Sequence, residues 1–128
     1  MSYTLDASAV LAALLDEPGG DLVTDNLRGS EISVVNLSEV YATLLDHGFS
    51  FDDADSIIGP LPIRTRTFRD AHAWHAAKLR PLTKSLGLSL GDRACLAQAA
   101  ANRLPVLTAD RRLAQASEIA GVSIEMIR

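Results

Sequence analysis

Apolar residues along the 128-residue chain fall into short blocks of two kinds. Blocks rich in β-branched residues, with apolar positions at a spacing of two, predict strands over residues 3–5, 31–35, 63–68, 104–108 and 122–127. Blocks rich in Ala and Leu, or with apolar residues at i, i+3, i+4 and i+7, predict helices over residues 7–15, 21–27, 36–48, 52–58, 70–79, 90–102 and 111–120. Residues 81–88 are predicted as a loop. Strands that alternate with helices are typical of an α/β fold, with a mostly parallel central sheet and helices on both faces.

The helix predicted over residues 90–102 has the clearest start. Ser89 and Asp92 have the spacing of a capping box, in which each side chain bonds a backbone amide at the other position. Asn36 and Glu39 have the same spacing at the start of an earlier helix. Helix capping therefore explains either acid when it is considered alone.

Composition is that of a folded chain. Hydrophobic residues make up 48% of the sequence and the mean hydropathy is +0.14, which excludes a disordered polymer. The longest uncharged apolar run, Ala7 to Leu15, is shorter than the roughly 18 residues that a membrane span needs. There is no signal peptide pattern, and the single cysteine, Cys95, cannot form an internal disulfide. We expect one domain over residues 1–128, located in the cytoplasm and not bound to a membrane.

Charge is sorted along the chain. Residues 1–55 hold eleven acids and one base, whereas residues 56–128 hold five acids and eleven bases. This asymmetry favours a polyanionic partner near the basic part. The candidate residues for binding such a polyanion are two arginines on one face of a predicted strand and three that adjoin acids: Arg64, Arg66, Arg93, Arg111 and Arg112. For each of them alone, a solvated surface is the ordinary alternative.

Four acids lie at or near helix starts, and three of them follow predicted strands. Asp6, Glu39 and Asp110 would emerge from the carboxyl ends of strands, and Asp92 heads a helix that could reach the same edge. Four carboxylates that converge repel one another unless a cation lies among them. Oxygen ligands without His or Cys favour Mg²⁺ or Mn²⁺ over zinc, and such a site suits phosphodiester hydrolysis.

Three hydroxyl residues are placed to orient these acids. Ser8, Ser38 and Thr108 each lie within two residues of a candidate ligand in the sequence. Ordinary helix capping explains the same hydroxyls equally well.

The motifs that carry these acids resemble those of a known family. Leu5-Asp6-Ala7-Ser8, Ser38-Glu39, Leu90-Gly91-Asp92-Arg93-Ala94 and Leu107-Thr108-Ala109-Asp110 resemble, in order, the four motifs of PIN-domain ribonucleases, and the compact length is most similar to VapC-type toxins. The resemblance implies a PIN-like three-layer α/β sandwich and an endoribonuclease that depends on Mg²⁺ or Mn²⁺. It also implies a homodimer, inhibition by a VapB-type antitoxin, and a metal-binding catalytic quartet of Asp6, Glu39, Asp92 and Asp110. Arg111 and Arg112 stand where a further acid would complete a second metal position.

Two other functions use the same features. A catalytically inactive α/β module that binds RNA or a protein partner would keep the fold and the basic region but would not cleave RNA. A phosphoacceptor domain also places acids at strand ends, but it would want a lysine near the last strands, and no lysine follows Lys84.

Overall fold

The computed structural model describes residues 1–128 and contains five strands, eight α-helices and one 3₁₀ turn. The strands are β1 (Thr4–Leu5), β2 (Glu31–Ser33), β3 (Arg64–Arg66), β4 (Val106–Thr108) and β5 (Ile124–Met126). The helices are α1 (Ala7–Leu14), α2 (Gly20–Asp25), α3 (Val34–Asp46), α4 (Phe51–Ile58), α5 (Asp70–Thr83), α6 (Leu90–Asn102), α7 (Arg111–Ala114) and α8 (Ser117–Ala120), and the 3₁₀ turn η1 covers Lys84–Leu86. None of these helices is long and apolar enough to cross a membrane.

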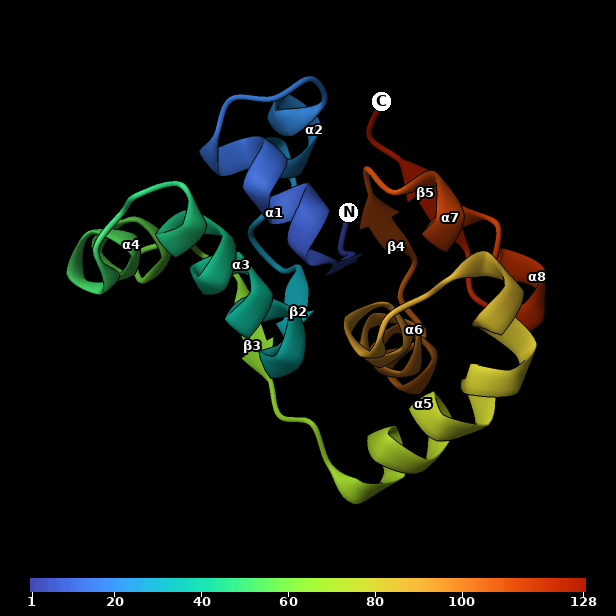
Figure 1. The fold of residues 1–128 in the computed structure, drawn as a ribbon. Helices are drawn as coiled ribbons and strands as arrows, with labels where there is room; N and C mark the ends of the chain where they lie inside the picture. Colours follow the sequence, from blue (N-terminus) through green and yellow to red (C-terminus); the bar gives the residue numbers. More distant parts are fainter.

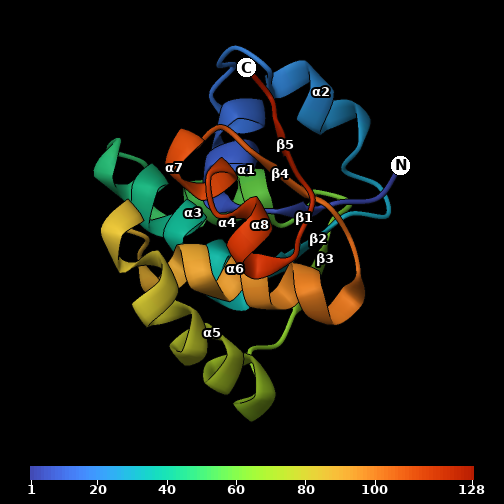
Figure 2. The ribbon, with the colours of Figure 1, turned by 90° about the vertical axis from the view of Figure 1, so that its right-hand side faces the viewer.

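All five strands are parallel and pair in the order β3-β2-β1-β4-β5. The chain therefore builds outward from β1 in one direction through β2 and β3, then returns to the other side of β1 for β4 and β5. The order reverses between β1 and β4, and open α/β sheets bind ligands outside the carboxyl ends of the strands at such a point. Figure 2 shows α3, α7 and the first turn of α6 together on one side of the molecule, with the N-terminus on the other.

Helices cover both faces of the sheet, as Figure 1 shows. One core lies between the sheet and α1 to α4, and its sheet residues are Leu5, Ile32 and Leu107, which neighbour one another in the strand register. The second core lies beneath α5 to α8 and includes Cys95, which is fully buried. Along β4, Val106 and its neighbour Leu107 point into different cores, and the predicted three-layer sandwich is confirmed.

The start of α3 corrects the sequence prediction. Val34 and Val35 were predicted to end a strand, but the strand stops at Ser33, whose Oγ accepts a hydrogen bond from the Val35 amide and caps the helix. The cap overrides the strand preference of two β-branched residues. The helix consequently starts two residues before Asn36, so Glu39 lies in its second turn rather than at its third position.

Two further boundaries differ from the prediction. The expected loop from residue 81 is helical through Thr83. Pro81 removes one backbone hydrogen bond, but Leu79 and Thr83 are buried and the Thr83 hydroxyl donates to the Leu79 carbonyl, which stabilises the last turn. The helix predicted over residues 111–120 divides into α7 and α8, because the Ala116 amide bonds to the Leu113 carbonyl and tightens the chain there.

Candidate active site

A cavity of about 280 Å³ opens at the carboxyl edge of the sheet, and all four acids of the expected quartet line it. Its walls come from the ends of β1 and β4 and from the first turns of α1, α3, α6 and α7. The lining residues are Asp6, Ala7, Ser8, Leu11, Asn36, Glu39, Gly87, Ser89, Asp92, Asp110 and Arg112. Acids that lie up to 104 residues apart in the sequence therefore face one space.

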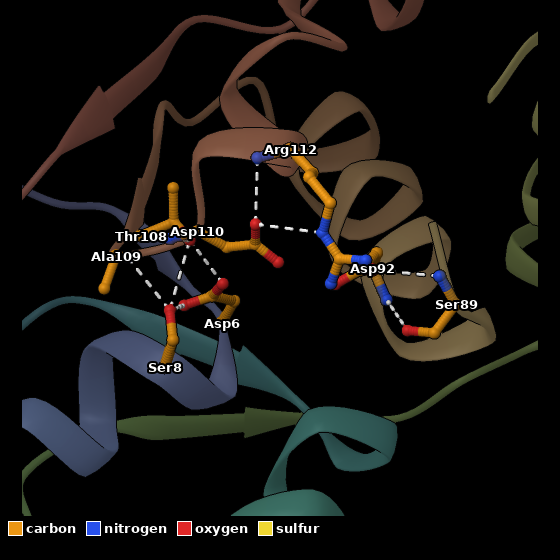
Figure 3. Close-up of polar contacts among 8 residues, drawn as sticks. All are labelled: Asp6, Ser8, Ser89, Asp92, Thr108, Ala109, Asp110 and Arg112. Carbon is orange, nitrogen blue, oxygen red and sulfur yellow. Dashed lines mark hydrogen bonds and ion pairs between the residues drawn. The ribbon is translucent and has the colours of Figure 1, made fainter. Parts of the chain in front are cut away.

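Asp6 lies deepest in the site, with only 4% of its surface exposed. It directly follows β1 and caps α1, because its Oδ1 accepts from the Ala9 amide at 2.9 Å. Ser8 Oγ donates to the same oxygen at 2.8 Å, and Thr108 Oγ1 donates to Oδ2 through a short hydrogen bond (Figure 3). These donors fix the plane of the carboxylate, and none of them carries a charge.

The pKa of Asp6 is raised from 3.8 to about 6, and burial is the largest cause. The hydrogen bonds from Thr108, Ala9 and Ser8 lower that pKa and so oppose burial, while the nearby charge of Asp92 raises it further. The ionised form of Asp6 is thus less stable in the folded protein than in water. A positive charge bound nearby would stabilise it.

Asp110 follows β4 and caps the short helix α7. Its Oδ1 accepts from the Arg112 amide at 2.9 Å, and the Arg112 Nε lies 3.6 Å from the same oxygen. Thr108 Oγ1 accepts from the Asp110 amide and also donates to Asp6, so one hydroxyl joins the ends of β1 and β4 (Figure 3). The structure gives Asp110 Oδ2 no protein partner.

Asp92 occupies the first turn of α6 and completes a reciprocal capping box with Ser89. The Ser89 amide donates to Asp92 Oδ2 at 2.9 Å, and the Asp92 amide donates to Ser89 Oγ at 3.2 Å (Figure 3). The cap occupies one carboxylate oxygen and no side chain bonds to the other. Capping and a place at the cavity are therefore compatible for the same acid.

Glu39 reaches the cavity from α3 and rests against the start of α6. Asn36, one turn earlier, donates to Glu39 Oε1 at 2.9 Å. A Cβ atom at Gly91 would lie 2.2 Å from the same oxygen, so the carboxylate packs on the bare backbone of that glycine. Burial raises the pKa of Glu39, the bond from Asn36 lowers it, and the charge of Asp92 raises it again.

Two of the three expected hydroxyl partners contact the acids, and one does not. Ser8 Oγ bonds Asp6, accepts from the Ala109 amide and lies 3.2 Å from Thr108 Oγ1. Ser38 is exposed on α3 and lies outside the cavity lining. The residue that does hold Glu39 is Asn36; the capping box that their spacing predicts is wrong, because Ser33 caps the helix.

The arginines on β3 lie apart from the acids. Arg66 Nε donates to Glu31 Oε2 at 2.8 Å, on the face of the sheet that α6 covers. Arg64 is exposed. Both remain predicted RNA contacts, and Arg66 would have to serve RNA while also compensating a buried acid.

The arginines that adjoin the acids in sequence diverge in space. Arg93 turns toward α5, where its Nη1 donates to the Ala76 carbonyl at 2.9 Å and its buried Nε has no partner. Arg112 lines the cavity, and Arg111 beside it is exposed. Arg112 is thus the single candidate base that shares the cavity with the acids.

The donor set fits a hard divalent cation, although no three acidic, histidine or cysteine side chains are grouped closely enough to form a metal site by themselves. Every anionic group around the cavity is a carboxylate, and an additional buried acceptor, Asn36 Oδ1, has no partner. The cavity, at about 280 Å³, has room for a cation together with several waters. Such a cation would be held partly through water.

A larger cavity of about 540 Å³ lies at the amino ends of β4 and β5. Arg103 and Glu125 are its charged residues, and half of its lining residues are hydrophobic. None of the four acids contributes to it. Size alone therefore does not identify the functional site.

Comparisons with known proteins agree with this geometry. The PIN domain family model matches residues 3–119. No curated protein matches the chain. Among solved structures, a toxin-antitoxin complex from Klebsiella pneumoniae has a TM-score of 0.73 at 16% identity and covers 98% of both chains.

Two further solved structures have the same fold. DNA-bound VapBC from Salmonella typhimurium has a TM-score of 0.73 at 17% identity and covers 100% of this chain and 99% of that chain. VapBC-5 from Mycobacterium tuberculosis is 26% identical, with a TM-score of 0.63, and covers 99% of this chain and 98% of that chain. Since the family model spans most of the sequence, the chain belongs to the PIN-domain family.

Proposed function

We propose that this protein is an endoribonuclease that depends on Mg²⁺ or Mn²⁺ and acts as the toxin of a type II toxin-antitoxin system. The observation that carries the proposal is the convergence of Asp6, Glu39, Asp92 and Asp110 on one cavity at the switch point of the sheet. Asp6 in particular is buried among neutral donors and other acids, which favours an added cation at this place.

The four carboxylates would hold the ion, with Asp6 as its most rigid ligand. When bound, a divalent ion positions and acidifies an attacking water and neutralises charge that develops on the phosphate. Thr108 and Ser8 keep both oxygens of Asp6 in place, and Ser89 keeps Asp92 in place. These hydrogen bonds exist before any ligand binds, so the site needs little reorganisation.

The similar solved structures support the choice of a protein partner. The similar solved structures from Salmonella typhimurium and Mycobacterium tuberculosis are VapBC toxin-antitoxin proteins. We propose that the chain is likewise of the VapC type, pairs with a VapB-type antitoxin, forms a homodimer and works on RNA in the cytoplasm. The basic second half of the chain supports a polyanionic substrate.

The test is RNA cleavage by the purified chain with Mg²⁺ or Mn²⁺, with chelator, and in the Asp92→Asn variant. We expect cleavage with either metal, none after exhaustive chelation, and a large loss in Asp92→Asn, in which the amide oxygen of Asn can still accept the hydrogen bond from the Ser89 amide. Asp70→Asn is the matched control, because Asp70 also lies in a first helical turn but outside the cavity. Cleavage that survives chelation, or equal activity of the two variants, would contradict the proposal.

The same assay addresses the inactive-module alternative. The observation in its favour is that Arg112 already approaches Asp110, so an internal cation competes for part of the site. A chain that binds RNA with normal salt dependence but cleaves none with either metal would establish that alternative.

A further inference from the structure

A cavity of about 170 Å³ lies beside the last residue of β3, between the start of α5 and the last turns of α6. It shares no lining residue with the cavity that holds the four acids. No hydrophobic residue and no carboxylate lines it, and two of its residues are arginines. The lining residues of this basic pocket are Arg66, Thr67, Arg69, His72, Gln98 and Asn102.

Buried Glu31 orients one wall of the basic pocket from below. Its Oε2 accepts from Arg66 Nε at 2.8 Å, and its two oxygens also accept from the side-chain amides of Gln98 and Asn102. Nε carries only one of the five guanidinium N–H groups, and the terminal nitrogens of Arg66 have no partner within the protein. Arg66 therefore compensates Glu31 and still has donors left for a ligand of the pocket that it lines.

The segment that joins β3 to α5 (Figure 1) supplies the other donors. His72 Nδ1 lies 3.0 Å from the Arg69 amide nitrogen, and because an amide N–H only donates, Nδ1 is the acceptor and the proton of the neutral ring is on Nε2. The ring also stacks on Phe68, with centroids 6.0 Å apart. The imidazole that lines the pocket is thus held by two contacts and has one free donor.

Arg69 brings the charge that the basic pocket does not balance. Its Nε donates to Thr67 Oγ1 at 3.3 Å, and no acid forms an ion pair with its exposed side chain. Since Arg66 and Glu31 offset each other, the charge of Arg69 remains uncompensated. Guanidinium groups match the oxygens of a phosphate in geometry and charge, so this combination of donors selects an oxyanion.

Helix α6 connects the basic pocket with the proposed active site. Asp92 lies in its first turn, and Gln98 and Asn102 follow six and ten residues later. At about 1.5 Å of rise per residue, the pocket is roughly 9–15 Å from Asp92 along the helix axis. An RNA strand whose cleaved bond lies at the acids can therefore bring a neighbouring phosphate to the pocket.

We propose that the basic pocket binds a backbone phosphate of the RNA substrate, a few nucleotides away from the bond that is cleaved. This inference rests on the proposed endoribonuclease function and adds Arg69 and His72 to the residues that contact RNA. It also gives Arg66 two compatible roles, because Nε faces the buried acid while the terminal nitrogens remain free. The pocket holds the substrate in place and takes no part in the chemical step.

The first experiment measures binding of a single-stranded RNA oligomer to the full chain, with chelator present and at several salt concentrations. Arg69→Gln removes one phosphate contact, so we expect binding about fivefold weaker at low salt and a salt slope smaller by about 0.7. Arg80→Gln is the matched control, because Arg80 is also exposed on the same side of the chain's basic region but lies in α5 outside the pocket. Arg80→Gln should bind within twofold of the wild type.

A second variant places a negative charge in the pocket. In His72→Glu, a glutamate at the third position of α5 can still accept from the Arg69 amide, so the start of the helix is kept. The new carboxylate repels a phosphate, and we expect RNA binding about tenfold weaker than in the wild type. His75→Glu is its control, because His75 is likewise half-buried on α5 but does not line the pocket, and it should bind within threefold of the wild type.

The other outcomes overturn the inference or its assignment to RNA. Pocket variants that bind RNA no more weakly than their controls overturn it. Inorganic phosphate, titrated by calorimetry, tests the other source of an oxyanion: phosphate binding that is lost in Arg69→Gln, with RNA binding unchanged, would assign the pocket to a free anion and overturn the assignment to RNA. If His72→Glu shows no cooperative thermal transition, the exposed position Arg69 decides the test alone.

Failure of the proposed function remains distinguishable. A wild-type chain that binds no RNA overturns the RNA substrate and this inference together. Normal binding and cleavage by the wild type, with an unaffected Arg69→Gln, overturns this inference alone. RNA binding that depends on Arg69 in a chain that cleaves no RNA would overturn the nuclease function and support the pocket.

Discussion

Asp6 and Glu31 are both buried carboxylates of the sheet, with exposures of 4% and 3%, but their surroundings differ. Glu31 accepts from the Arg66 guanidinium at 2.8 Å and from the side-chain amides of Gln98 and Asn102. Asp6 accepts from two hydroxyls and one backbone amide, none of them charged, and the nearby charge of Asp92 raises its pKa.

Under the proposed function, this difference separates a structural acid from a candidate metal ligand. When a buried carboxylate pairs with a cation of the protein, its charge is compensated, and removing one partner leaves the other uncompensated. When the protein supplies no such cation, the charge of the buried carboxylate is compensated only if a cation binds. Burial is nearly equal in the two cases, so the identity of the neighbours carries the functional information.

Catalysis should separate the two acids most strongly. We expect Asp6→Asn to reduce metal-dependent RNA cleavage by roughly a thousandfold, because loss of an ion's main ligand removes several kcal/mol of transition-state stabilisation. Glu31→Gln should retain cleavage within a few-fold per folded molecule, because Glu31 does not line the cavity. Single-turnover rates with saturating Mn²⁺ measure both, and comparable losses in the two variants would remove the distinction.

The pH dependence of stability gives the next largest effect. The folded-state pKa of Asp6 is raised to about 6 from 3.8, so its contribution to stability is fully present below about pH 4 and is lost as the pH rises through 6. At roughly 1.4 kcal/mol per pKa unit, the loss approaches about 3 kcal/mol by pH 7.

Urea unfolding of metal-free wild type and Asp6→Asn between pH 4 and pH 7.5 checks this value. We expect Asp6→Asn to be the more stable protein at neutral pH, and the difference to shrink toward pH 4. Saturating Mg²⁺ should reduce it at pH 7 by mass action. A difference between the two proteins that does not change with pH would show that Asp6 ionises without cost.

Glu31 should respond with the opposite sign. Glu31→Gln leaves Arg66 without its carboxylate, and because the Arg66 side chain is 38% exposed, water offsets part of the loss. We expect destabilisation of about 1–2 kcal/mol at pH 7 in urea unfolding. Arg66→Met and the double variant complete a cycle, and additive effects would mean that the pair contributes no coupling.

The residues of this comparison also show what the sequence could reveal. Asp6 and Asp110 could be placed because each follows a short apolar strand, and parallel strands end at one edge of a sheet. The pairing of Glu31 with Arg66 could not, because it joins residues 35 positions apart and depends on which strands become neighbours. Local sequence patterns therefore predict the helices and strands and the edge of the sheet where the acids lie. They do not predict which buried acid has a cation beside it, because that depends on long-range pairing.

Asn36 illustrates the same limit within the site. Its spacing to Glu39 predicts a capping box, which is wrong: the two side chains bond each other inside the helix, and a cap and such a contact share that spacing. Which of the two forms depends on Ser33, three residues earlier, which caps α3, and on Gly91, 55 residues later, whose carbonyl accepts from Asn36. A glycine directly before an acid in a helix's first turn was the one available signal of close approach.

Arg112 provides the smallest and most selective test, because it is the cation nearest to an acid of the cavity. Its Nε lies 3.6 Å from Asp110 Oδ1 and its side chain is 61% exposed, so the pair resembles surface ion pairs that contribute about 0.2–1 kcal/mol. A divalent cation must compete with that contact for Asp110, and Arg112→Gln should therefore raise Mn²⁺ affinity by about 1.4-fold to fivefold. Arg111→Gln is the control. It removes the same charge one residue earlier in the chain, and the exposed Arg111 side chain forms no ion pair with the acids. Calorimetric titration of the three proteins at low ionic strength measures the difference. If both variants gain equally, the gain reflects net charge alone, and Arg112 does not balance Asp110 in the way that Arg66 balances Glu31.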